Sequence, residues 1–369
     1  MDIFGFISLL GGLAMFLYGM SMLASGLERA SGGRLERTLE KMTDTVIKGV
    51  ALGALVTAAI QSSSATTVIV VGLVNAQVLK LRNAIGVIMG ANIGTTITAH
   101  ILRLSDLQTD NFFLMLLKPK SLAPLAMIVG ILFFMSAKRD RQKNIGIILL
   151  GFGVLFTGMF AMEGAVAPLS NEPWFTSLFA TFRNPVIGIL VGTFVTAAIQ
   201  SSAASIGILQ ALTSTGLITY SMAFPIIMGQ NIGTCITPIL ASIGASKNAK
   251  RTAAVHVSFN VLGTIIFVIG CYTFQHFVGF SFWDAPIDKG GIANFHTIFN
   301  VTVTLLFIPL VGLLEKIART LVRDKPGDRD QEITAITLDE RLLVSPGLAV
   351  EHAREAVVQM ANIARQNYL

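Results

Sequence analysis

The sequence has little charge and almost no cysteine. Only 13% of its 369 residues are Asp, Glu, Lys or Arg, while 53% are hydrophobic, and the mean hydropathy is +0.70. A soluble domain carries about 25% charged residues and needs polar side chains to cover its surface. The two cysteines, Cys235 and Cys271, form neither a disulfide framework nor a CxxC metal motif. The composition therefore excludes a soluble enzyme and predicts an all-α polytopic membrane protein.

Ionisable side chains are missing from three long segments. Residues 49–79, 83–99 and 184–246 contain no Asp, Glu, Lys, Arg or His. A proton-coupled carrier normally has a titratable group inside the membrane, so this absence favours a metal cation as coupling ion. Glu163 is the one acid inside an expected span. It could be a gate or a cation ligand, but we expect it to snorkel near the outer helix end.

The charge that is present is unevenly divided. Residues 324–369 hold 8 acids and 5 bases, a net charge of −3, whereas residues 1–323 hold 13 acids and 22 bases, net +9. The bases lie in separate loops and make no single patch, so nucleic acid is not an expected partner. Spans of about 20 apolar residues are expected from this pattern. They are residues 3–26, 121–137, 144–168, 252–275 and 292–314.

Two polar stretches repeat each other. Residues 53–98 and 192–237 align without a gap at an offset of 139, with 22 of 46 positions identical. The first includes GALVTAAIQSSSATT and IMGANIGTTIT, and the second includes GTFVTAAIQSSAASI and IMGQNIGTCIT. Duplicated polar segments inside a membrane protein are typical of transporters built from two structural repeats.

The placement of basic residues predicts the topology, because short Lys/Arg-rich loops stay in the cytoplasm. If each polar stretch enters the membrane and returns on the same side, the basic clusters at 29–48, 138–143, 247–251 and 316–323 all lie inside. The two copies are then three crossings apart, an odd number, so they are inverted relative to each other. We expect a cell (inner) membrane protein with its N-terminus outside and its C-terminal tail in the cytoplasm.

Each copy combines a Gln-Ser-Ser motif (61–64 and 200–202) with a GxNIGT motif (90–95 and 229–234). A chain break at hydroxyl-rich residues exposes N–H groups at a new helix N-terminus, which binds anions. Asn, Gln and Thr oxygens and freed carbonyls suit a small cation. The pattern predicts discontinuous helices that meet near the midplane of the membrane. The alternative is that small residues only pack helices together, but packing does not need an identical Gln and Asn in both copies.

A second internal echo involves histidine and asparagine. His256 and Asn260 are four residues apart, as are His296 and Asn300, so each pair lies on one helix face. We expect hydrogen bonds between scaffold helices. A metal site is the alternative, although two histidines without carboxylates do not define one.

The paired motifs resemble the bacterial form of the type II sodium-dependent phosphate cotransporters over about residues 5–315. The resemblance implies two inverted repeats, each with a spanning helix, a re-entrant helical hairpin and a broken helix, plus additional scaffold helices. Residues 338–351 look like the start of a PhoU-like helical domain. The implied phosphate ligands are Ser62, Ser63, Ser64, Thr66, Ser201, Ser202 and Ser205. The implied sodium ligands are Gln61, Asn92, Thr95, Thr96, Gln200, Asn231 and Thr234.

The second copy departs from the family pattern. Ala203 replaces the third serine, and Ser205 with Ile206 replaces two threonines. Some hydroxyl ligands of phosphate or of one sodium ion are therefore missing there, and the stoichiometry stays open.

The expected function is sodium-driven uptake of inorganic phosphate across the lipid bilayer, without a further cofactor. The alternatives are a carrier for another oxyanion, a membrane phosphate sensor acting through the tail, and an anion channel. An enzyme is not expected, because no catalytic spacing is present. A homodimer is one possible assembly. The expected units are residues 1–137 (first repeat), 138–323 (second repeat and scaffold helices) and 324–369 (soluble tail, with an amphipathic helix over 338–369).

Overall fold

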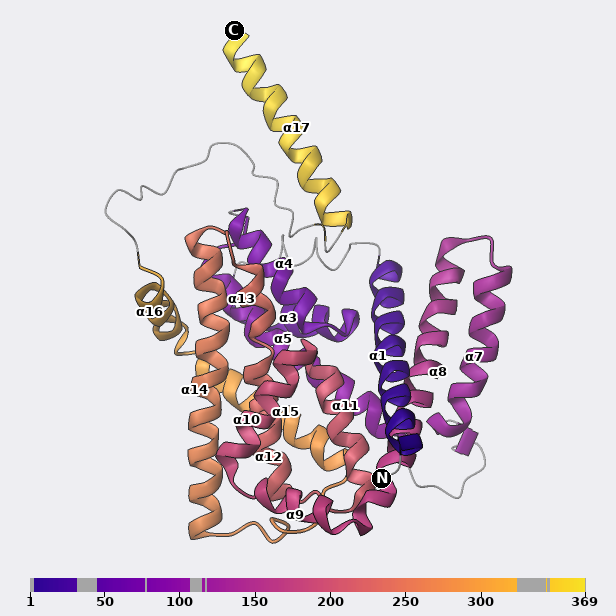
Figure 1. Ribbon diagram of the computed structural model, residues 1–369. Coiled ribbons are helices and arrows are strands. Elements are labelled where there is room, and N and C mark those ends of the chain that lie inside the picture. Colours follow the sequence, from indigo (N-terminus) through magenta and orange to yellow (C-terminus); the bar gives the residue numbers. More distant parts are fainter. Residues whose placement is uncertain are drawn as a thin grey trace.

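The computed structural model describes residues 3–31, 45–76, 78–106, 115–116, 118–323, 343 and 346–368. These residues form an all-α membrane protein (Figure 1). Within the described ranges, seven helices are long and apolar enough to cross a membrane. They are Ile3–Ala30, Leu81–Asp106, Pro119–Ser136, Asp140–Asn171, Tyr220–Ala241, Lys247–Phe277 and Lys289–Phe307.

The elements follow one another along the chain in an order that reflects the repeat. The first copy contains α1 (Ile3–Ser31), α3 (Val46–Ile60), α4 (Ser63–Asn75), α5 (Leu81–Leu102) and η1 (Arg103–Asp106). Next come α7 (Pro119–Ser136), α8 (Asp140–Val166), η2 (Ala167–Asn171) and α9 (Pro173–Thr181). The second polar stretch forms α10 (Pro185–Ile199), α11 (Ser202–Leu212), η3 (Thr213–Thr215), α12 (Tyr220–Gly233) and α13 (Ile236–Ala241). The chain then forms α14 (Lys247–Phe277), α15 (Lys289–Phe307), α16 (Val311–Leu321) and α17 (Pro346–Tyr368).

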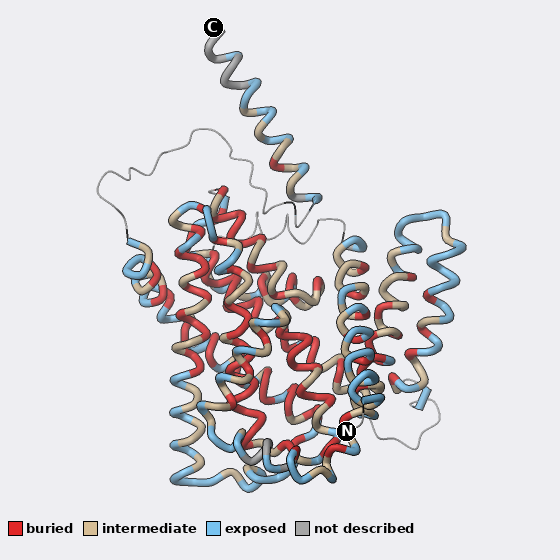
Figure 2. Tube along the Cα trace, viewed as in Figure 1, coloured by how far each residue is buried: buried red, intermediate tan, exposed pale blue. Residues whose placement is uncertain are grey.

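The helices form two groups in space. We call α1, α7 and α8 the three-helix group, and the helices from α3 to α5 and from α10 to α16 the hairpin group (Figure 1). Buried residues gather in the hairpin group, whereas α1, α7 and the C-terminal half of α14 expose large apolar side chains (Figure 2). Such outward-facing apolar surface is what lipid contact requires. The grouping crosses the expected boundary at residue 137, because α7 packs on α8.

Helices α1 and α8 are held together by reciprocal glycine contacts. A Cβ atom on Gly12 would lie 3.0 Å from the carbonyl oxygen of Gly158, and one on Gly19 would lie 2.9 Å from that of Gly151. The residue order shows that the two helices run antiparallel. At the offset of 139, Gly12 corresponds to Gly151 and Gly19 to Gly158, so equivalent positions exchange partners. Inverted copies require this of their first helices; the relation between the complete copies stays a prediction.

The five spans expected from sequence are confirmed, with shifted ends. The one expected over 292–314 ends at Phe307, because the chain turns at residues 308–310, which include Pro309. Two further spans, Leu81–Asp106 and Tyr220–Ala241, come from the polar copies.

The expected broken helix is wrong for the first copy and correct for the second. Helix α5 continues through the whole GANIGT motif, whereas α12 and α13 are separate, with Thr234 and Cys235 between them. The physical reason is one substitution, since Pro238 stands where the first copy has Ala99. Proline has no N–H to donate to the carbonyl of Thr234, and its ring clashes with that carbonyl.

In the tail, α17 begins at Pro346, and residues 324–342 lie outside the described ranges. The amphipathic helix expected over 338–369 is therefore seen from Pro346 to Tyr368. Val357 and Met360 of its apolar stripe are exposed, and Ala349 and Ala353 are half-buried. The C-terminal end of α17 points away from the body (Figure 1). The resemblance to a PhoU-like domain stays untested.

Candidate functional site

Two glutamines adopt the same unusual backbone conformation. Gln61 follows α3 with φ 58° and ψ 26°, and Gln200 follows α10 with φ 58° and ψ 24°. They are the non-glycine residues with positive φ in the described chain. In this left-handed form each glutamine N–H donates to the carbonyl of Thr57 or Thr196 and closes the helix. A non-glycine residue pays about 1 kcal/mol or more for that conformation, a strain typical of functional sites.

A serine then starts a new helix in each copy. Ser62 is the N-cap of α4 and accepts a hydrogen bond from Ala65 N at 3.1 Å, and Ser201 is the N-cap of α11 and accepts from Ala204 N at 3.2 Å. The first N–H groups of α4 and α11 have no acceptor within their own helix. The chain break predicted at each Gln-Ser-Ser motif is therefore confirmed, and it presents two helix N-termini.

We call the two Gln-Ser-Ser turns, at Gln61–Ser64 and Gln200–Ser202, the tips. The two tips come together beside a cavity. Ser64 Oγ donates to the Gln200 carbonyl at 3.3 Å, and Thr237 Oγ1 donates to Ser64 Oγ at 3.5 Å. A cavity of about 360 Å³ lies between the tips and α1. That volume corresponds to about twelve waters. Its polar lining consists of Gln61, Ser62 and Ser201 from the tips and Ser21, Ser25 and Glu28 from α1.

Threonines that the sequence analysis did not single out hold the tips. Thr98 Oγ1 donates to Gln61 Oε1 at 2.9 Å, and Gln61 Nε2 donates to the Ala58 carbonyl. At the offset of 139, Thr98 corresponds to Thr237, which contacts Ser64 of the other copy. Both threonines end an Ile-Thr pair that begins one residue after the GxNIGT motif. That duplicated pair is the signal that could have revealed them.

Some predicted phosphate ligands face their own copy instead of the cavity. Thr66 Oγ1 accepts from Thr57 Oγ1 and donates to the Ser62 carbonyl, both at 3.0 Å. Ser205 Oγ accepts from Gln230 Nε2 at 2.9 Å. Ser63 and Ser202 are buried as the first residues of α4 and α11. Of the seven residues, Ser62 and Ser201 line the hollow and Ser64 bridges the two tips.

The predicted sodium ligands form two sets. Gln61 and Gln200 are at the tips, whereas the asparagines pair with scaffold helices: Asn92 Nδ2 donates to Asn260 Oδ1 at 2.7 Å, and Asn231 Nδ2 to Asn300 Oδ1 at 2.6 Å. The hydroxyls of the neighbouring threonines donate to carbonyls within their own helical segments. These are Thr95 to Ala91, Thr96 to Ile93 and Thr234 to Asn231.

The His-Asn echo supports these pairs. Asn260 Nδ2 donates to the His256 carbonyl at 3.0 Å, and Asn300 Nδ2 to the His296 carbonyl at 2.8 Å. The scaffold hydrogen bonds expected from sequence are present. In the described part of the chain, no group of three His, Cys, Asp or Glu side chains could hold a metal ion.

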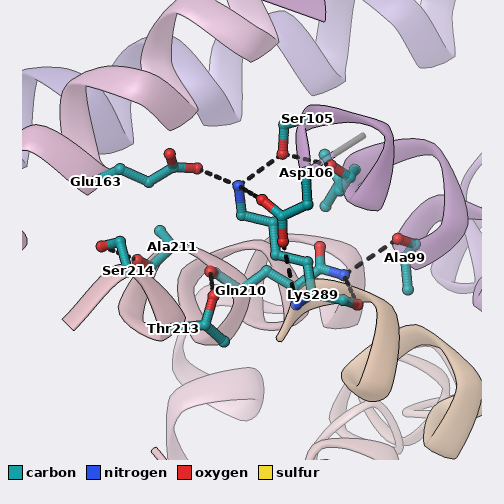
Figure 3. A network of polar contacts seen from close by, with 10 residues as sticks. Ala99, Ser105, Asp106, Glu163, Gln210, Ala211, Thr213, Ser214 and Lys289 are labelled. Atoms are coloured by element: carbon teal, nitrogen blue, oxygen red, sulfur yellow. Dashed lines mark hydrogen bonds and ion pairs between the residues drawn. The ribbon is translucent and has the colours of Figure 1, made fainter. Parts of the chain in front are cut away.

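Glu163 does not snorkel as expected. Its Oε1 lies 2.7 Å from Lys289 Nζ, and its side chain is 20% exposed (Figure 3). The reason is long-range packing: the start of α15, with Lys289, is placed against α8, so the carboxylate has a cationic partner inside the protein. No local pattern predicts this pair, because the two residues are far apart in the chain.

Comparisons with known proteins identify the family of the chain. The chain matches the family model described as Na+/Pi-cotransporter over residues 15–164 and 158–282. YqeW of Bacillus subtilis (strain 168) is 33% identical over 314 residues, which cover 85% of this chain and 97% of that protein. YjbB of Escherichia coli (strain K12), whose name proposes inorganic phosphate export, is 26% identical over 360 residues. That match covers 97% of this chain but 63% of YjbB, so the chain spans less than two thirds of that relative.

A shorter match reaches a mammalian protein. The sodium-dependent phosphate transport protein 2A of Rattus norvegicus is 34% identical over 128 residues, 32% of this chain and 20% of that protein. No solved structure matches. Because the family model covers well over half of the sequence, this chain belongs to the Na+/Pi-cotransporter family.

Proposed function

We propose that the protein is a secondary active transporter that couples inward movement of Na+ to uptake of inorganic phosphate. One observation carries the proposal: two equivalent Gln-Ser tips, one from each copy, meet at a single cavity. Family membership supports phosphate as the substrate and sodium as the coupling ion. The geometry supports an anion at the tips, because two helix N-termini and the hydroxyls of Ser62, Ser64 and Ser201 converge there.

Sodium would balance the charge of the bound anion. The tips carry no ionised side chain, so only partial charges from helix termini would attract an anion with a charge of one or two, and the cavity lining also includes the acidic Glu28. Gln61 lines the cavity, and Gln200 immediately precedes the lining residue Ser201; both amide oxygens would be suitable sodium ligands if their side chains turned toward the ion. Asn92, Asn231 and the nearby threonines would join only by exchanging their present hydrogen bonds. Bound sodium would then raise phosphate affinity, and phosphate would raise sodium affinity by the same factor.

Equilibrium binding to the purified protein tests this coupling. Titration calorimetry with phosphate in sodium chloride is compared with the same titration in potassium chloride. We expect phosphate to bind at least about tenfold more weakly in potassium, a coupling within the usual range. Equal affinity in the two salts would contradict sodium coupling. Sulfate and arsenate as competitors decide whether another oxyanion is the preferred substrate.

The direction of transport has its own test. Uptake is our proposal, whereas the name of the relative YjbB concerns export. A coupled carrier is reversible, so the gradients decide the direction. Vesicles loaded with phosphate should export it when sodium is concentrated inside, and import it when sodium is concentrated outside. Movement that ignores the sodium gradient would favour a channel.

A further inference from the structure

A lysine is buried among carboxylates at the start of α15. Lys289 is 3% exposed, and its Nζ lies 2.7 Å from Glu163 Oε1 and 2.9 Å from Asp106 Oδ1. The same Nζ donates to Ser105 Oγ at 2.6 Å (Figure 3). An ammonium is buried only when it is paired and hydrogen-bonded. We call Lys289, Glu163 and Asp106 the ion cluster; the proposed phosphate site does not use it.

The ion cluster crosses the boundary between the two helix groups. Glu163 belongs to α8 of the three-helix group, whereas Lys289 belongs to α15 of the hairpin group, and Asp106 lies in η1, which continues α5 and contacts α15. Gln210 of α11 donates to the Lys289 carbonyl at 3.0 Å and to the Ala99 carbonyl at 3.1 Å. The Lys289–Glu163 contact is therefore an ion pair between the two groups. Its lysine side is anchored to α11, the helix that begins at the second tip.

The ion cluster and the cavity lie at different ends of that boundary. The cavity is at Ser201, at the start of α11, while Gln210 is nine residues later, about 13 Å along the helix axis. On α1 the cavity lining runs from Leu17 to Glu28. Glu163 instead follows Met162, whose backbone packs on Gly12.

An aromatic side chain fills the boundary between them. Phe16 of α1 is completely buried, and its ring occupies the space where a Cβ on Gly207 of α11 would stand. Gly207 lies between Ser201 and Gln210 in the chain. Phe16 thus fills the boundary between the cavity at Ser201 and the ion cluster. A second cavity of about 610 Å³ lies beside Glu163, between α1, the end of α8 and η2.

The described positions equivalent to the ion cluster carry no charged side chains. At the offset of 139, the positions equivalent to Glu163, Asp106 and Gln210 are Ala24, Ala245 and Val71, and the His-Asn echo at an offset of 40 relates Lys289 to Ala249. Val71, Ala245 and Ala249 pack together as a small apolar cluster, and Ala24 lines the open cavity. The residues of the ion cluster therefore have apolar counterparts at the equivalent positions of the other copy.

We propose that Lys289, Glu163 and Asp106 form a gate that closes the transport path at the Glu163 end, the outer end in the predicted orientation. The proposal rests on the proposed transport function. Opening separates Glu163 from Lys289, while Lys289 stays neutralised by Asp106 within the hairpin group. The repeat positions equivalent to Glu163 and Asp106 are apolar, so this ion pair favours the state that is closed at the Glu163 end. Glu163 and Lys289 act as gating residues and do not bind the substrate.

Accessibility labelling tests the gate without phosphate or sodium. A Ser62→Cys reporter at the tip is treated with a membrane-impermeant maleimide from each side of sealed vesicles, and the protein without the reporter corrects for Cys235 and Cys271. We expect labelling from the cavity side alone. Adding Glu163→Gln removes a buried ion pair between the groups, so it should raise labelling from the Glu163 side by at least about tenfold and lower it from the cavity side.

Matched variants keep the result interpretable. Glu163→Ala, which copies the apolar residue of the other repeat, should act like Glu163→Gln. Asp284→Asn removes an exposed carboxylate from the loop before Lys289 and should change nothing. Thermal unfolding in detergent shows whether each variant is folded.

Two outcomes overturn the gate: equal labelling of the Glu163 variants and the parent from the Glu163 side, or labelling of the parent from both sides. The phosphate proposal fails separately. If the protein binds no phosphate but the Glu163 variants show the labelling shift, the gate proposal stands and the phosphate proposal fails. If the protein transports phosphate with sodium but the variants show no labelling shift, the gate proposal fails.

Discussion

At the scale of single residues, Gln61 and Gln200 are the most informative positions. Both hold a left-handed backbone that glycine would adopt at lower cost, yet both copies carry glutamine. The side chain of Gln61 is fixed by Thr98 and by its own helix. We infer that the amide group is what the tip needs, and that the backbone strain is the cost of placing it there.

Replacement by glycine separates these two roles. Gln61→Gly or Gln200→Gly keeps the turn and removes the amide, so the unfolding temperature should stay within a few degrees of the parent, since strain relief of about 1 kcal/mol offsets lost contacts. Phosphate uptake should be abolished, as it should in Gln61→Ala and Gln200→Ala. Thermal unfolding in detergent and vesicle uptake measure the two effects. Normal uptake by either glycine variant would show that the site is wrongly assigned.

The asparagine pairs make a second residue-scale prediction. Asn92→Ala leaves the buried Oδ1 of Asn260 without its donor, which should lower the free energy of unfolding by about 1–3 kcal/mol. A double-mutant cycle with Asn260→Ala should give a coupling energy of about 1 kcal/mol. The Asn231 and Asn300 pair offers the same cycle in the other copy. Strictly additive losses would mean that the pair does not hold the helices together.

Residue patterns predicted part of the site. The Gln-Ser-Ser tips could be predicted because the duplication marks them and a hydroxyl-rich break has a known consequence for helix ends. The roles of Thr98 and Thr237 were not predicted, because a threonine near a helix end has no distinctive pattern until its partner is known. The partner of Glu163 could not be predicted, because Lys289 reaches it only through tertiary packing.

At the scale of elements, one residue explains why the GxNIGT helix is broken in the second copy and continuous in the first. Pro238 divides the second GxNIGT helix into α12 and α13, whereas Ala99 leaves α5 continuous. The sequence predicted a break in both copies from their shared polar motif. The threonine hydroxyls of the first copy satisfy carbonyls inside the intact helix, so polarity alone does not break it.

Close contact between α3 and α5 gives an element-scale prediction. A Cβ on Gly53 would overlap the carbonyl oxygen of Val87, and one on Gly192 would overlap that of Ile226. Gly53→Ala should force these backbones apart and destabilise the protein by about 1–3 kcal/mol.

Gly11 provides the matched control for that change. Nothing lies within 4 Å of a Cβ built there, so Gly11→Ala should be neutral or stabilising by up to about 1 kcal/mol. Unfolding temperatures of the two variants are compared. A Gly53→Ala protein as stable as Gly11→Ala would contradict the described packing.

At the scale of the whole molecule, a boundary between two helix groups is the central feature. The tips stand at this boundary, with the hollow at one end and the ion cluster at the other. The sequence predicted spanning helices, a repeat and a polar centre, because composition and duplication carry that information. It did not predict that α1, α7 and α8 form a group, because glycine contacts between distant helices leave no local pattern.

Phosphate accumulation in proteoliposomes tests the central claim most directly. Radiolabelled phosphate is supplied outside, with sodium concentrated outside in one sample and potassium in a matched one. We predict accumulation above the equilibrium level with sodium alone. Binding without accumulation would contradict transport and favour a sensor, and equal accumulation with potassium would contradict sodium coupling.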